Sequence, residues 1–354
     1  HKDDFLILLA DILNVLVVGF VLLSALINLK VILRRRMKKA TIIIPVYNSE
    51  KYIKRCMESI LSQIDETFEV LLINDGSNDR SEDIIDSYAK KYPGIVRVIS
   101  KKNEGTAKTR NLGIRELRGE FIFFIDNDDF VDDGYFKRFI NAIDEKSDIV
   151  VGGYRRVEDK KVRFQSFPKN SSWYKFTVVA PWAKIYKREF LLKNDISFLD
   201  CGLGEDVYFN IVAYSTAKSV KVIEYVGYNW YFNTKSISNT SQRGFNPDLN
   251  VVYVLDKIYQ RIGNTQKVYS YFYVRYGIWY LLFSGRKASR DAFLKEYKRI
   301  FEWYEKNAIP KKFPLFGKET KGDSFFTKLT VNVFLVVDKL KLVNVFAKLY
   351  CSEK

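Results

Sequence analysis

From residue 40 onward, apolar and polar positions follow two alternating periods. Continuous apolar runs, which are typical of strands buried in a parallel sheet, cover residues 41–46, 68–74, 96–100 and 121–125. Segments with apolar residues every three or four positions predict helices at about 53–64, 81–91 and 106–119. Strands that alternate with helices of this length indicate an α/β fold with a mostly parallel, doubly wound sheet.

The stretch that follows is less regular. We expect strands at 149–153 and 220–231, and a helix that ends near Thr216. Residues 154–172 are polar and predict a loop or an edge hairpin. Together with the alternating elements, this stretch defines a Rossmann-like domain that we place at residues 39–245.

The C-terminal region, 246–354, is predicted to form helices rich in Tyr, Phe and Trp. Its tail, 325–350, carries one apolar stripe, formed by Phe326, Leu329, Val333, Val336, Leu340, Val343 and Ala347. Residues 310–354 hold nine lysines against four acidic residues. This composition is typical of a basic amphipathic helix on an anionic membrane surface. A helix packed on its own domain explains the stripe equally well.

The N-terminal region, 1–38, is an apolar helix with a basic flank. Residues 5–33 are almost wholly apolar, and the uncharged run 12–29 is just long enough, at about 27 Å, to cross a hydrocarbon core. Arginines at 34–36 follow it, which predicts that the remainder of the chain faces the cytoplasm. The apolar spacing also suits an interfacial helix or one that forms homo-oligomers. A segment foreign to the natural protein is a third reading, since position 1 is not Met.

The amino-acid composition favours some kinds of partner and excludes some kinds of catalytic site. The formal net charge of +16 favours an anionic partner, such as nucleic acid, lipid headgroups or a phosphorylated substrate. The three cysteines are far apart, which fits neither a disulfide framework nor a zinc site. The one histidine is His1, so catalysis through a Ser–His–Asp or Cys–His arrangement is excluded. The base of an enzyme with this sequence is expected to be a carboxylate.

An acidic cluster directly follows the apolar run 121–125. Asp126, Asp128 and Asp129 repel one another unless a cation or hydrogen-bond donors lie among them. A hard divalent cation that carries phosphates meets that need. An EF-hand loop is excluded, because Val131 and Lys137 stand where Gly and Glu are required. A solvated acidic turn remains the simpler alternative.

Two other strand ends carry polar, turn-forming residues, and in a doubly wound sheet these ends converge. Asp75 at one end could accept the N3–H of uracil, and its alternative is a plain turn residue. Arg110, on the helix before the acidic strand, could reach a diphosphate or simply lie at the surface. The phosphate-loop and dinucleotide signatures are absent, which argues against a kinase or a dehydrogenase.

The motifs in their order resemble family-2 glycosyltransferases of bacteria with the GT-A fold. They are Ile43-Ile44-Pro45-Val46-Tyr47-Asn48, Asn74-Asp75-Gly76-Ser77-x-Asp79, Arg110-Asn111-x-Gly113, Phe124-x-Asp126-x-Asp128-Asp129, Pro181-Trp182-Ala183-Lys184-Ile185-Tyr186 and Gly204-Glu205-Asp206-x-x-Phe209. The resemblance covers about residues 40–240. The Gln-x-x-Arg-Trp motif of processive polysaccharide synthases is absent, so the resemblance is to non-processive enzymes.

This resemblance implies a role for each matched residue. The nucleotide would contact Pro45, Val46, Tyr47, Asn48, Asp75, Arg110, Asp126 and Asn127. Asp128, with Asp126, would hold Mn²⁺ or Mg²⁺ against the donor diphosphate. Asp206 would be the general base, with Glu205 beside it. The donor sugar and acceptor would lie against Trp182, Lys184, Asp129, Trp230 and Arg243. For Glu205 and Asp206, acids that stabilise the first turn of a helix are the simpler alternative.

The activity implied is metal-dependent, inverting transfer of one sugar from a UDP-sugar to a hydroxyl of a glycan acceptor. That acceptor would be held on a polyprenyl diphosphate at the cytoplasmic face of the bacterial cell membrane, during assembly of a surface polysaccharide. Transfer to polyprenyl phosphate, a teichoic acid or a protein is the alternative within enzymes. A non-catalytic membrane or nucleic-acid binding protein is the remaining alternative, and it leaves the acidic strand end unexplained. We expect no nucleic-acid partner.

Overall fold

The computed structural model describes residues 18–20, 22–24, 37–158, 161–166, 173–176, 178–202, 204–232, 244–245, 250–264 and 266–352. Most of the predicted N-terminal apolar helix lies outside these ranges, and so does Arg243. Among the described residues, no helix combines the length and the apolar character needed to cross a bilayer.

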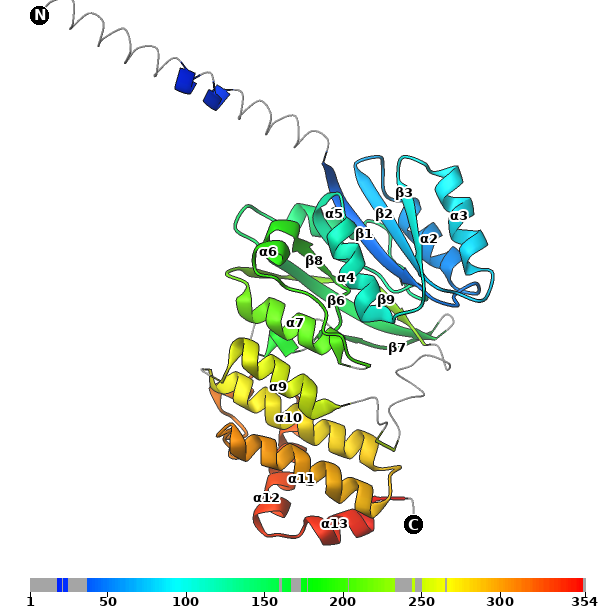
Figure 1. Ribbon diagram of the computed structural model, residues 1–354. Coiled ribbons are helices and arrows are strands. Elements are labelled where there is room, and N and C mark those ends of the chain that lie inside the picture. The colour runs from blue at the N-terminus through cyan, green and yellow to red at the C-terminus, as the bar shows by residue number, and fades with distance from the viewer. Residues whose placement is uncertain are drawn as a thin grey trace, which may run out of the picture.

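A mixed sheet forms the body of the molecule (Figure 1). Its strands are β1 (Lys38–Val46), β2 (Phe68–Asp75), β3 (Val96–Lys101), β4 (Gly119–Phe124), β5 (Phe130–Val131), β6 (Ile149–Glu158), β7 (Lys161–Ser166), β8 (Lys184–Lys187) and β9 (Val220–Tyr231). The strand order is β3-β2-β1-β4-β8-β6-β9-β5, and β7 pairs with the later residues of β6, which β8 does not reach.

The first four strands confirm the predicted parallel half, since β1 pairs in parallel with both β2 and β4, and β2 pairs in parallel with β3. The sequence pattern missed β8, which joins β4 to β6 and is antiparallel to both. Beyond it, β6 and β9 run parallel again. The polar stretch after residue 153 forms the predicted hairpin in part, because β6 continues to Glu158 and turns back as β7.

Helices cover both faces of the sheet. They are α2 (Ile53–Leu61), α3 (Ser81–Lys91) and α5 (Tyr135–Ala142) on one face, and α4 (Thr106–Glu116), α6 (Arg188–Lys193) and α7 (Glu205–Thr216) on the other. The period of two along β1 explains this arrangement. Ile42 and Ile44 pack into the core beneath α2, whereas Ile43 packs into the core beneath α4.

Helix α4 lies unusually close to β1, and Gly113 makes this possible. A Cβ added at Gly113 would lie 2.6 Å from Cγ2 of Ile43 and 3.2 Å from Cδ1 of Ile73. Such distances are shorter than van der Waals contact, so a side chain at position 113 would push the helix off the sheet. The depth of α4 is therefore set by a glycine.

A second, all-helical layer stacks against α7 (Figure 1). It comprises α9 (Val251–Ile262), α10 (Lys267–Gly285), α11 (Arg290–Lys306), α12 (Phe325–Lys339) and α13 (Val343–Tyr350), with short 3₁₀ turns at Tyr174–Phe176 and Lys318–Thr320. Its core is strongly aromatic, and Val207 and Ile211 of α7 belong to the same cluster of buried side chains. The predicted helical, aromatic-rich C-terminal region is confirmed.

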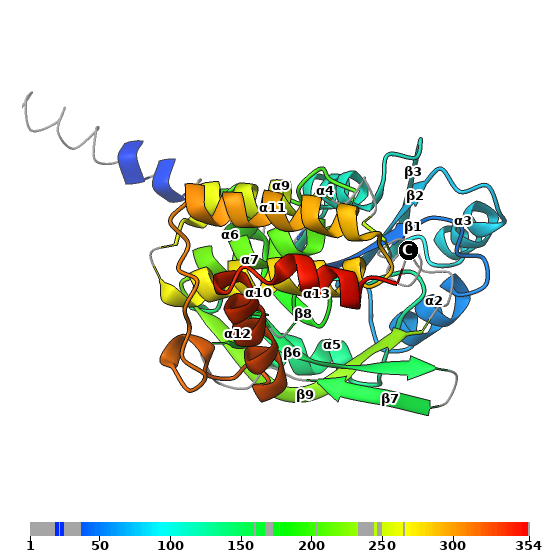
Figure 2. The same ribbon diagram turned by 90° about the horizontal axis from the view of Figure 1, so that it is seen from below.

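The tail differs from the single apolar stripe that we predicted. The chain leaves the helical conformation between α12 and α13, where Lys341 adopts a φ of 59°. Val343 and Ala347 then pack into the helical core, whereas Phe326 and Val333 stay exposed. Figure 2 shows α12 and α13 as two separate helices that lie at an angle to each other. The stripe therefore divides into a buried part and an exposed part.

Candidate active site

The acidic turn, formed by residues 126–129, lies where β4 ends, next to the carboxyl end of β1. Ile125 donates a backbone hydrogen bond to Ile43, and the turn closes when the Asp129 amide donates to the Asp126 carbonyl over 3.1 Å. The Asn127 side chain then donates to the carbonyl of Pro45 over 2.7 Å. These bonds hold the predicted metal residues beside the predicted nucleotide residues of β1.

Arg55 of α2 braces the same turn, and the sequence reading missed it. Its Nη2 donates to the Asp128 carbonyl over 2.7 Å. Its guanidinium carbon lies 4.7 Å from the ring centroid of Phe130 and 4.0 Å from that of Tyr231. Stacking of this kind both places a guanidinium and keeps it near the turn. On a helix surface, a lone arginine gives no sequence signal for such a role.

Asp129 is fully buried rather than displayed at the surface of the turn. Its carboxylate accepts from the Tyr228 hydroxyl over 2.6 Å and from the Tyr231 amide over 2.8 Å. Burial, followed by the charges of Asp128 and Asp126, raises the pKa of Asp129 well above its usual value. In this structure Asp129 ties the turn to β9, and its contact with sugar or acceptor remains a prediction.

Three carboxyl groups lie within this short turn, and the charges of Asp128 and Asp126 add to the effect of burial on the pKa of Asp129. Asp126 and Asp128 supply carboxylate oxygens, which suit a divalent cation that shares its coordination with substrate phosphates. Among the described residues, no group of three or more potential ligands is preassembled around one point. The residues present thus fit a magnesium or manganese ion that is held partly by the donor diphosphate.

The nucleotide side of the site is formed at the ends of β1 and β2. Asn48 adopts a left-handed φ of 46°, and its Oδ1 accepts from the Asn78 amide over 2.8 Å. Tyr47 beside it is exposed, whereas Pro45 and Val46 are the buried end of β1. Asn48 therefore joins the loop after β1 to the loop after β2. The exposed Tyr47 ring is accessible to a ligand.

Asp75 already has partners on both carboxylate oxygens. Its Oδ1 pairs with Lys101 and accepts from the Glu104 amide over 3.0 Å, and its Oδ2 accepts from the Gly105 amide over 2.9 Å. Burial raises the pKa of Asp75, but the hydrogen bonds from Lys101 and the two amides outweigh it, so the pKa lies below its usual value. Asp75 is thus a fixed anion, and the predicted bond to uracil would use a remaining lone pair.

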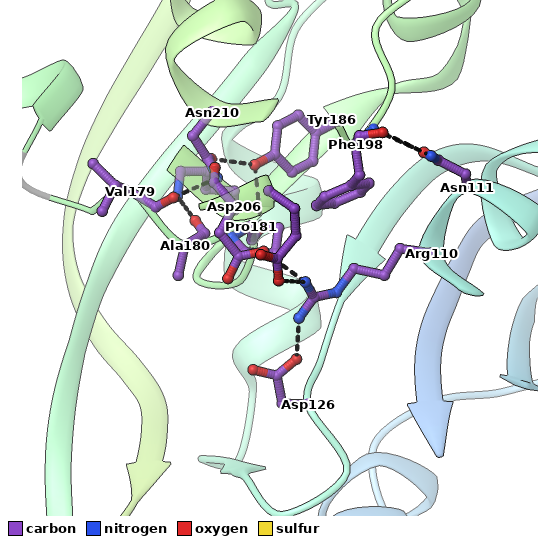
Figure 3. Close-up of polar contacts among 12 residues, drawn as sticks. Arg110, Asn111, Asp126, Val179, Ala180, Pro181, Tyr186, Phe198, Asp206 and Asn210 are labelled. Carbon is purple, nitrogen blue, oxygen red and sulfur yellow. Dashed lines mark hydrogen bonds and ion pairs between the residues drawn. The ribbon is translucent and has the colours of Figure 1, made fainter. Parts of the chain in front are cut away.

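Arg110 is the centre of the site (Figure 3). Its side chain is buried, and its Nη2 lies 2.7 Å from Oδ1 of Asp126. Its Nη1 lies 2.6 Å from Oδ1 of Asp206 and 3.6 Å from Oε1 of Glu205. One guanidinium from α4 therefore joins the acidic turn after β4 to the first turn of α7. The sequence motifs named these four residues, and the structure brings them together.

Burial and repulsion between neighbouring carboxylates set the pKa values of the acidic groups around Arg110. Burial raises the pKa of Asp206 to about 8, despite the opposing charge of Arg110, and the charges of Glu205 and Asp126 add to the rise. The pKa of Glu205 is raised as well, first by burial. Burial lowers the pKa of Arg110, but Asp206, Asp126 and Glu205 together raise it above its usual value. Asp206 is therefore a carboxyl group that titrates close to neutral pH, as a general base requires.

Helix α7 is held in place by Asn210, which the sequence reading also missed. Its side-chain amide donates to Val179 over 2.6 Å and to Asp206 over 2.8 Å, and its Oδ1 accepts from the Tyr186 hydroxyl over 3.0 Å. Gly204 precedes the helix with a φ of 98°, and a Cβ there would lie 3.0 Å from Val254. These contacts fix the position of Asp206 relative to β8.

The predicted sugar and acceptor residues occupy more interior positions than we expected. Lys184 is fully buried, and its ammonium group donates to the carbonyls of Val178 over 2.9 Å and Trp182 over 3.3 Å. Trp182 is buried and stacks on Tyr228, with the ring centroids 4.7 Å apart. In this structure both shape the loop beneath the site, and their contact with substrate remains a prediction.

Comparison with known proteins agrees with this geometry. Residues 41–202 match the sequence profile described as glycosyl transferase family 2. This segment, somewhat less than half of the chain, therefore resembles glycosyltransferase family 2, as the motifs predicted. The family 2 segment contains β1 to β8, the acidic turn and Arg110, and it ends just before the helix that carries Asp206.

Two curated relatives illustrate the likeness. The chain is 32% identical over 215 residues to a Bacillus subtilis protein named "Uncharacterized glycosyltransferase EpsJ", which is 56% of this chain and 62% of the relative. It is 32% identical over 209 residues to the poly(ribitol-phosphate) beta-glucosyltransferase of Bacillus spizizenii, which is 56% of this chain and 32% of the relative. The matches thus span less than two thirds of either relative.

Among solved structures, the fold is similar to S. aureus TarS residues 1–349 in complex with UDP-GlcNAc. The TM-score is 0.60 at 21% identity, and the match covers 87% of this chain and 89% of that one. The likeness extends beyond the family 2 segment into the C-terminal helices. It shows that the GT-A fold predicted from the motifs is correct.

Proposed function

We propose that this protein transfers one sugar from a UDP-sugar to a hydroxyl of a bacterial cell-surface glycan or wall polymer, with inversion at the anomeric carbon. The observation that carries the proposal is the position of Asp206. A carboxyl group with a pKa near neutrality lies 2.6 Å from an arginine that also binds the acidic turn. The proposed base Asp206, the cationic Arg110 and the acidic turn that would hold the metal and diphosphate thus lie next to one another.

The reaction follows from these positions. The acceptor oxygen bonds to the anomeric carbon as the bond to the diphosphate oxygen breaks, and the proton of the hydroxyl passes to Asp206. Attack from the face opposite the diphosphate turns an α-linked donor into a β-glycoside. A divalent ion held by Asp128 and Asp126 would supply positive charge for the departing diphosphate. Glu205 lies beside Asp206 at the start of α7, where it keeps the pKa of the base high.

Arg110 has two tasks in this scheme. In the free protein it neutralises Asp126 and Asp206, two partly exposed carboxylates that would otherwise repel each other. When UDP-sugar is bound, its guanidinium can bond to diphosphate oxygens in the bidentate way that phosphates favour. A shift of Arg110 toward the diphosphate would release Asp206 to accept the proton.

A release assay tests the proposal. UDP production is measured with UDP-Glc, UDP-Gal, UDP-GlcNAc and UDP-GalNAc, with and without Mn²⁺ or Mg²⁺. We expect one donor to be used, and we expect the metal to be required. Failure of all four donors with either metal would overturn the proposal. An Asp128→Ala variant that kept metal-dependent UDP binding would refute the metal assignment alone.

Two classes of acceptor remain under this proposal. The motifs resemble enzymes that extend polyprenyl-diphosphate-linked glycans, and this is our first candidate. The second is a poly(polyol phosphate) of the cell wall, since one relative is named a poly(ribitol-phosphate) beta-glucosyltransferase. Parallel assays with the two acceptor types, using the donor found above, separate them.

We further propose that the protein works at the cytoplasmic face of the cell membrane. The exposed part of the tail stripe supports this location, because Phe326 is 77% exposed and Val333, Val336 and Leu340 are each more than half exposed. Exposed lysines at 339, 341 and 348 lie close to these apolar side chains in the sequence. Apolar groups combined with lysines favour binding to anionic headgroups.

Flotation with vesicles tests the location. The full chain should float to a greater extent with vesicles that contain phosphatidylglycerol than with neutral phosphatidylcholine, because the lysines of the tail add to the apolar contacts. Phe326→Glu together with Val333→Glu should weaken flotation on the anionic vesicles while leaving UDP release intact. Equal flotation of the variant would refute the role of α12.

A further inference from the structure

A second buried arginine, Arg156 on β6, lacks a hydrogen-bond partner at a terminal nitrogen, whereas in Arg55 and Arg110 the buried atom without a partner among the described residues is Nε. The residue is only 5% exposed, and its Nη1 has no hydrogen-bond partner among the described residues. Buried polar groups in proteins are nearly always hydrogen-bonded, and a buried charge without a partner is costly. This guanidinium therefore requires an explanation.

The surroundings of Arg156 face the predicted acceptor residues. Its guanidinium carbon lies 3.3 Å from the ring centroid of Trp230 and 5.0 Å from that of Phe232. In the pairing of β6 with β9, Arg156 stands opposite Trp230. Burial lowers the pKa of Arg156, while the charges of Asp129 and Asp128 raise it. The guanidinium is thus aligned on an aromatic face and close enough to the acidic turn to sense its charge.

Strand order separates Arg156 from the nucleotide side. Most of the predicted nucleotide residues, 45–48 and Asp75, lie at the ends of β1 and β2, on one side of β4. β6 and β9 lie on the other side of β4, beyond β8. Arg110 already lies between the acidic turn and Asp206, where the donor diphosphate is expected. A ligand at Arg156 would therefore lie toward the acceptor.

We propose that Arg156 binds a phosphate of the acceptor, close to the hydroxyl that receives the sugar. A guanidinium stacked on an aromatic ring presents its N–H groups in one plane, which matches two oxygens of a phosphodiester. Because Arg156 is almost fully enclosed, the groups that cover it must shift when the phosphate binds. This inference rests on the proposed function and refines it, since it selects a phosphate-bearing acceptor.

A binding experiment tests Arg156 without any need for turnover. A synthetic tetramer of ribitol phosphate and free ribitol are titrated by calorimetry into the full chain saturated with UDP and Mg²⁺. We expect the tetramer to bind and ribitol to bind at least tenfold more weakly. Arg156→Gln should lose at least tenfold in tetramer affinity, and Arg156→Lys should lose less, because it keeps the charge without the planar fork.

The neighbouring arginine provides a matched control. Arg155 lies on the same strand, and its Nη2 contacts Asp132 at 3.0 Å and the Val226 carbonyl at 2.8 Å. Its Nη2 therefore has partners within the protein, and only its Nε is recorded as buried without a hydrogen bond among the described residues. Arg155→Gln should leave tetramer affinity within twofold of that of the unmodified protein. Such a result would show that removing an arginine from β6 does not by itself weaken tetramer binding.

Three results would overturn the inference. One is unchanged tetramer affinity in Arg156→Gln. Another is an equal loss of affinity for UDP, which would assign Arg156 to the donor diphosphate. The third is a loss of Mg²⁺-dependent UDP binding alone, which would mean that Arg156 merely neutralises the acidic turn. A thermal melt of each variant confirms that it is folded, and Arg156→Lys supplies the second test if Arg156→Gln is not.

The same measurements separate this inference from the proposed function. If no UDP-sugar supports transfer but the tetramer still binds in an Arg156-dependent way, the proposed function fails and the phosphate site stands. If transfer proceeds onto neutral and phosphate-bearing acceptors with the same KM, and that KM is unchanged in Arg156→Gln, the phosphate site fails and the proposed function stands.

Discussion

Arg110 and Arg156 are both enclosed by the protein, yet their environments are opposite. Arg110 lies among Asp126, Glu205 and Asp206, with two contacts shorter than 2.8 Å. Arg156 lies against the Trp230 ring and has an unpartnered Nη1 among the described residues. Both terminal nitrogens of Arg110 are paired in this structure, and only its Nε lacks a partner among the described residues, whereas in Arg156 a terminal nitrogen lacks one. A buried charge thus serves stability in one place and recognition in the other.

The largest expected effect concerns the base that Arg110 holds. Asp206→Asn removes the proton acceptor and keeps the shape of the side chain, so kcat should fall about 10³-fold, as loss of a general base does. UDP affinity should stay within a few fold. Turnover measured with the preferred donor and acceptor checks this, and full activity in the variant would exclude Asp206 as the base.

Removing either arginine should affect stability very differently. Arg110→Gln leaves three carboxyl groups without their counter-charge, and it should lower the free energy of unfolding by about 3 kcal/mol. Arg156→Leu removes a charge with an unmet hydrogen bond, so stability should change by less than about 1 kcal/mol or increase. Urea unfolding at pH 8 compares the two. Similar losses in both variants would contradict the contrast drawn above.

The pH dependence of activity should report on Arg110. A base with a pKa of about 8 is protonated at lower pH, so kcat/KM should rise about tenfold per pH unit below 8 and level off above it. Because Arg110 lowers this pKa, its replacement by Gln should move the limb to higher pH, and Lys should move it less. A limb that stays in place would mean that another group titrates.

A smaller effect than that of Arg110→Gln is expected at the link between the acidic turn and β9. Tyr228→Phe removes the hydroxyl that donates to Asp129 over 2.6 Å and leaves a buried carboxyl with one partner fewer. The free energy of unfolding should fall by about 1–2 kcal/mol. Donor affinity should weaken only slightly, because Arg55 still braces the turn. Thermal melting and UDP titration check the two parts.

Local sequence pattern was enough for the parts of the fold built from continuous segments. The apolar run before Asp126 and the spacing of the first helices predicted the parallel half correctly. The run 184–187 was missed because a four-residue strand carries no reliable period, and β8 is one of three antiparallel strands, with β5 and β7, that make the sheet mixed. The tail was read as one stripe because Leu340 and Val343 keep helical spacing across a turn whose backbone breaks it.

In the candidate site, too, local motifs predicted some features, whereas others depend on contacts between distant parts of the chain. Motif order named Arg110, Asp126 and Asp206, and these do meet in space. Nothing in the sequence shows that Lys184 turns toward carbonyls of its own loop, or that Asp129 is enclosed by β9. Arg156 was passed over because it lies in a polar stretch that suggested a solvated edge hairpin. Whether a charged residue is covered depends on elements far away in the chain, and no local pattern records it.

Gly113 has a consequence for how related chains can vary. Arg110 lies one turn before Gly113 on α4, so the depth at which the helix seats on Ile43 decides how far the guanidinium reaches. A larger residue at 113 would lift the helix, and both short contacts to Asp126 and Asp206 would lengthen. Positions 43 and 113 should therefore change together among related chains, with a smaller side chain at 43 wherever 113 is not glycine. The reach of the Arg110 guanidinium is thus set by two residues that pack against each other in the core.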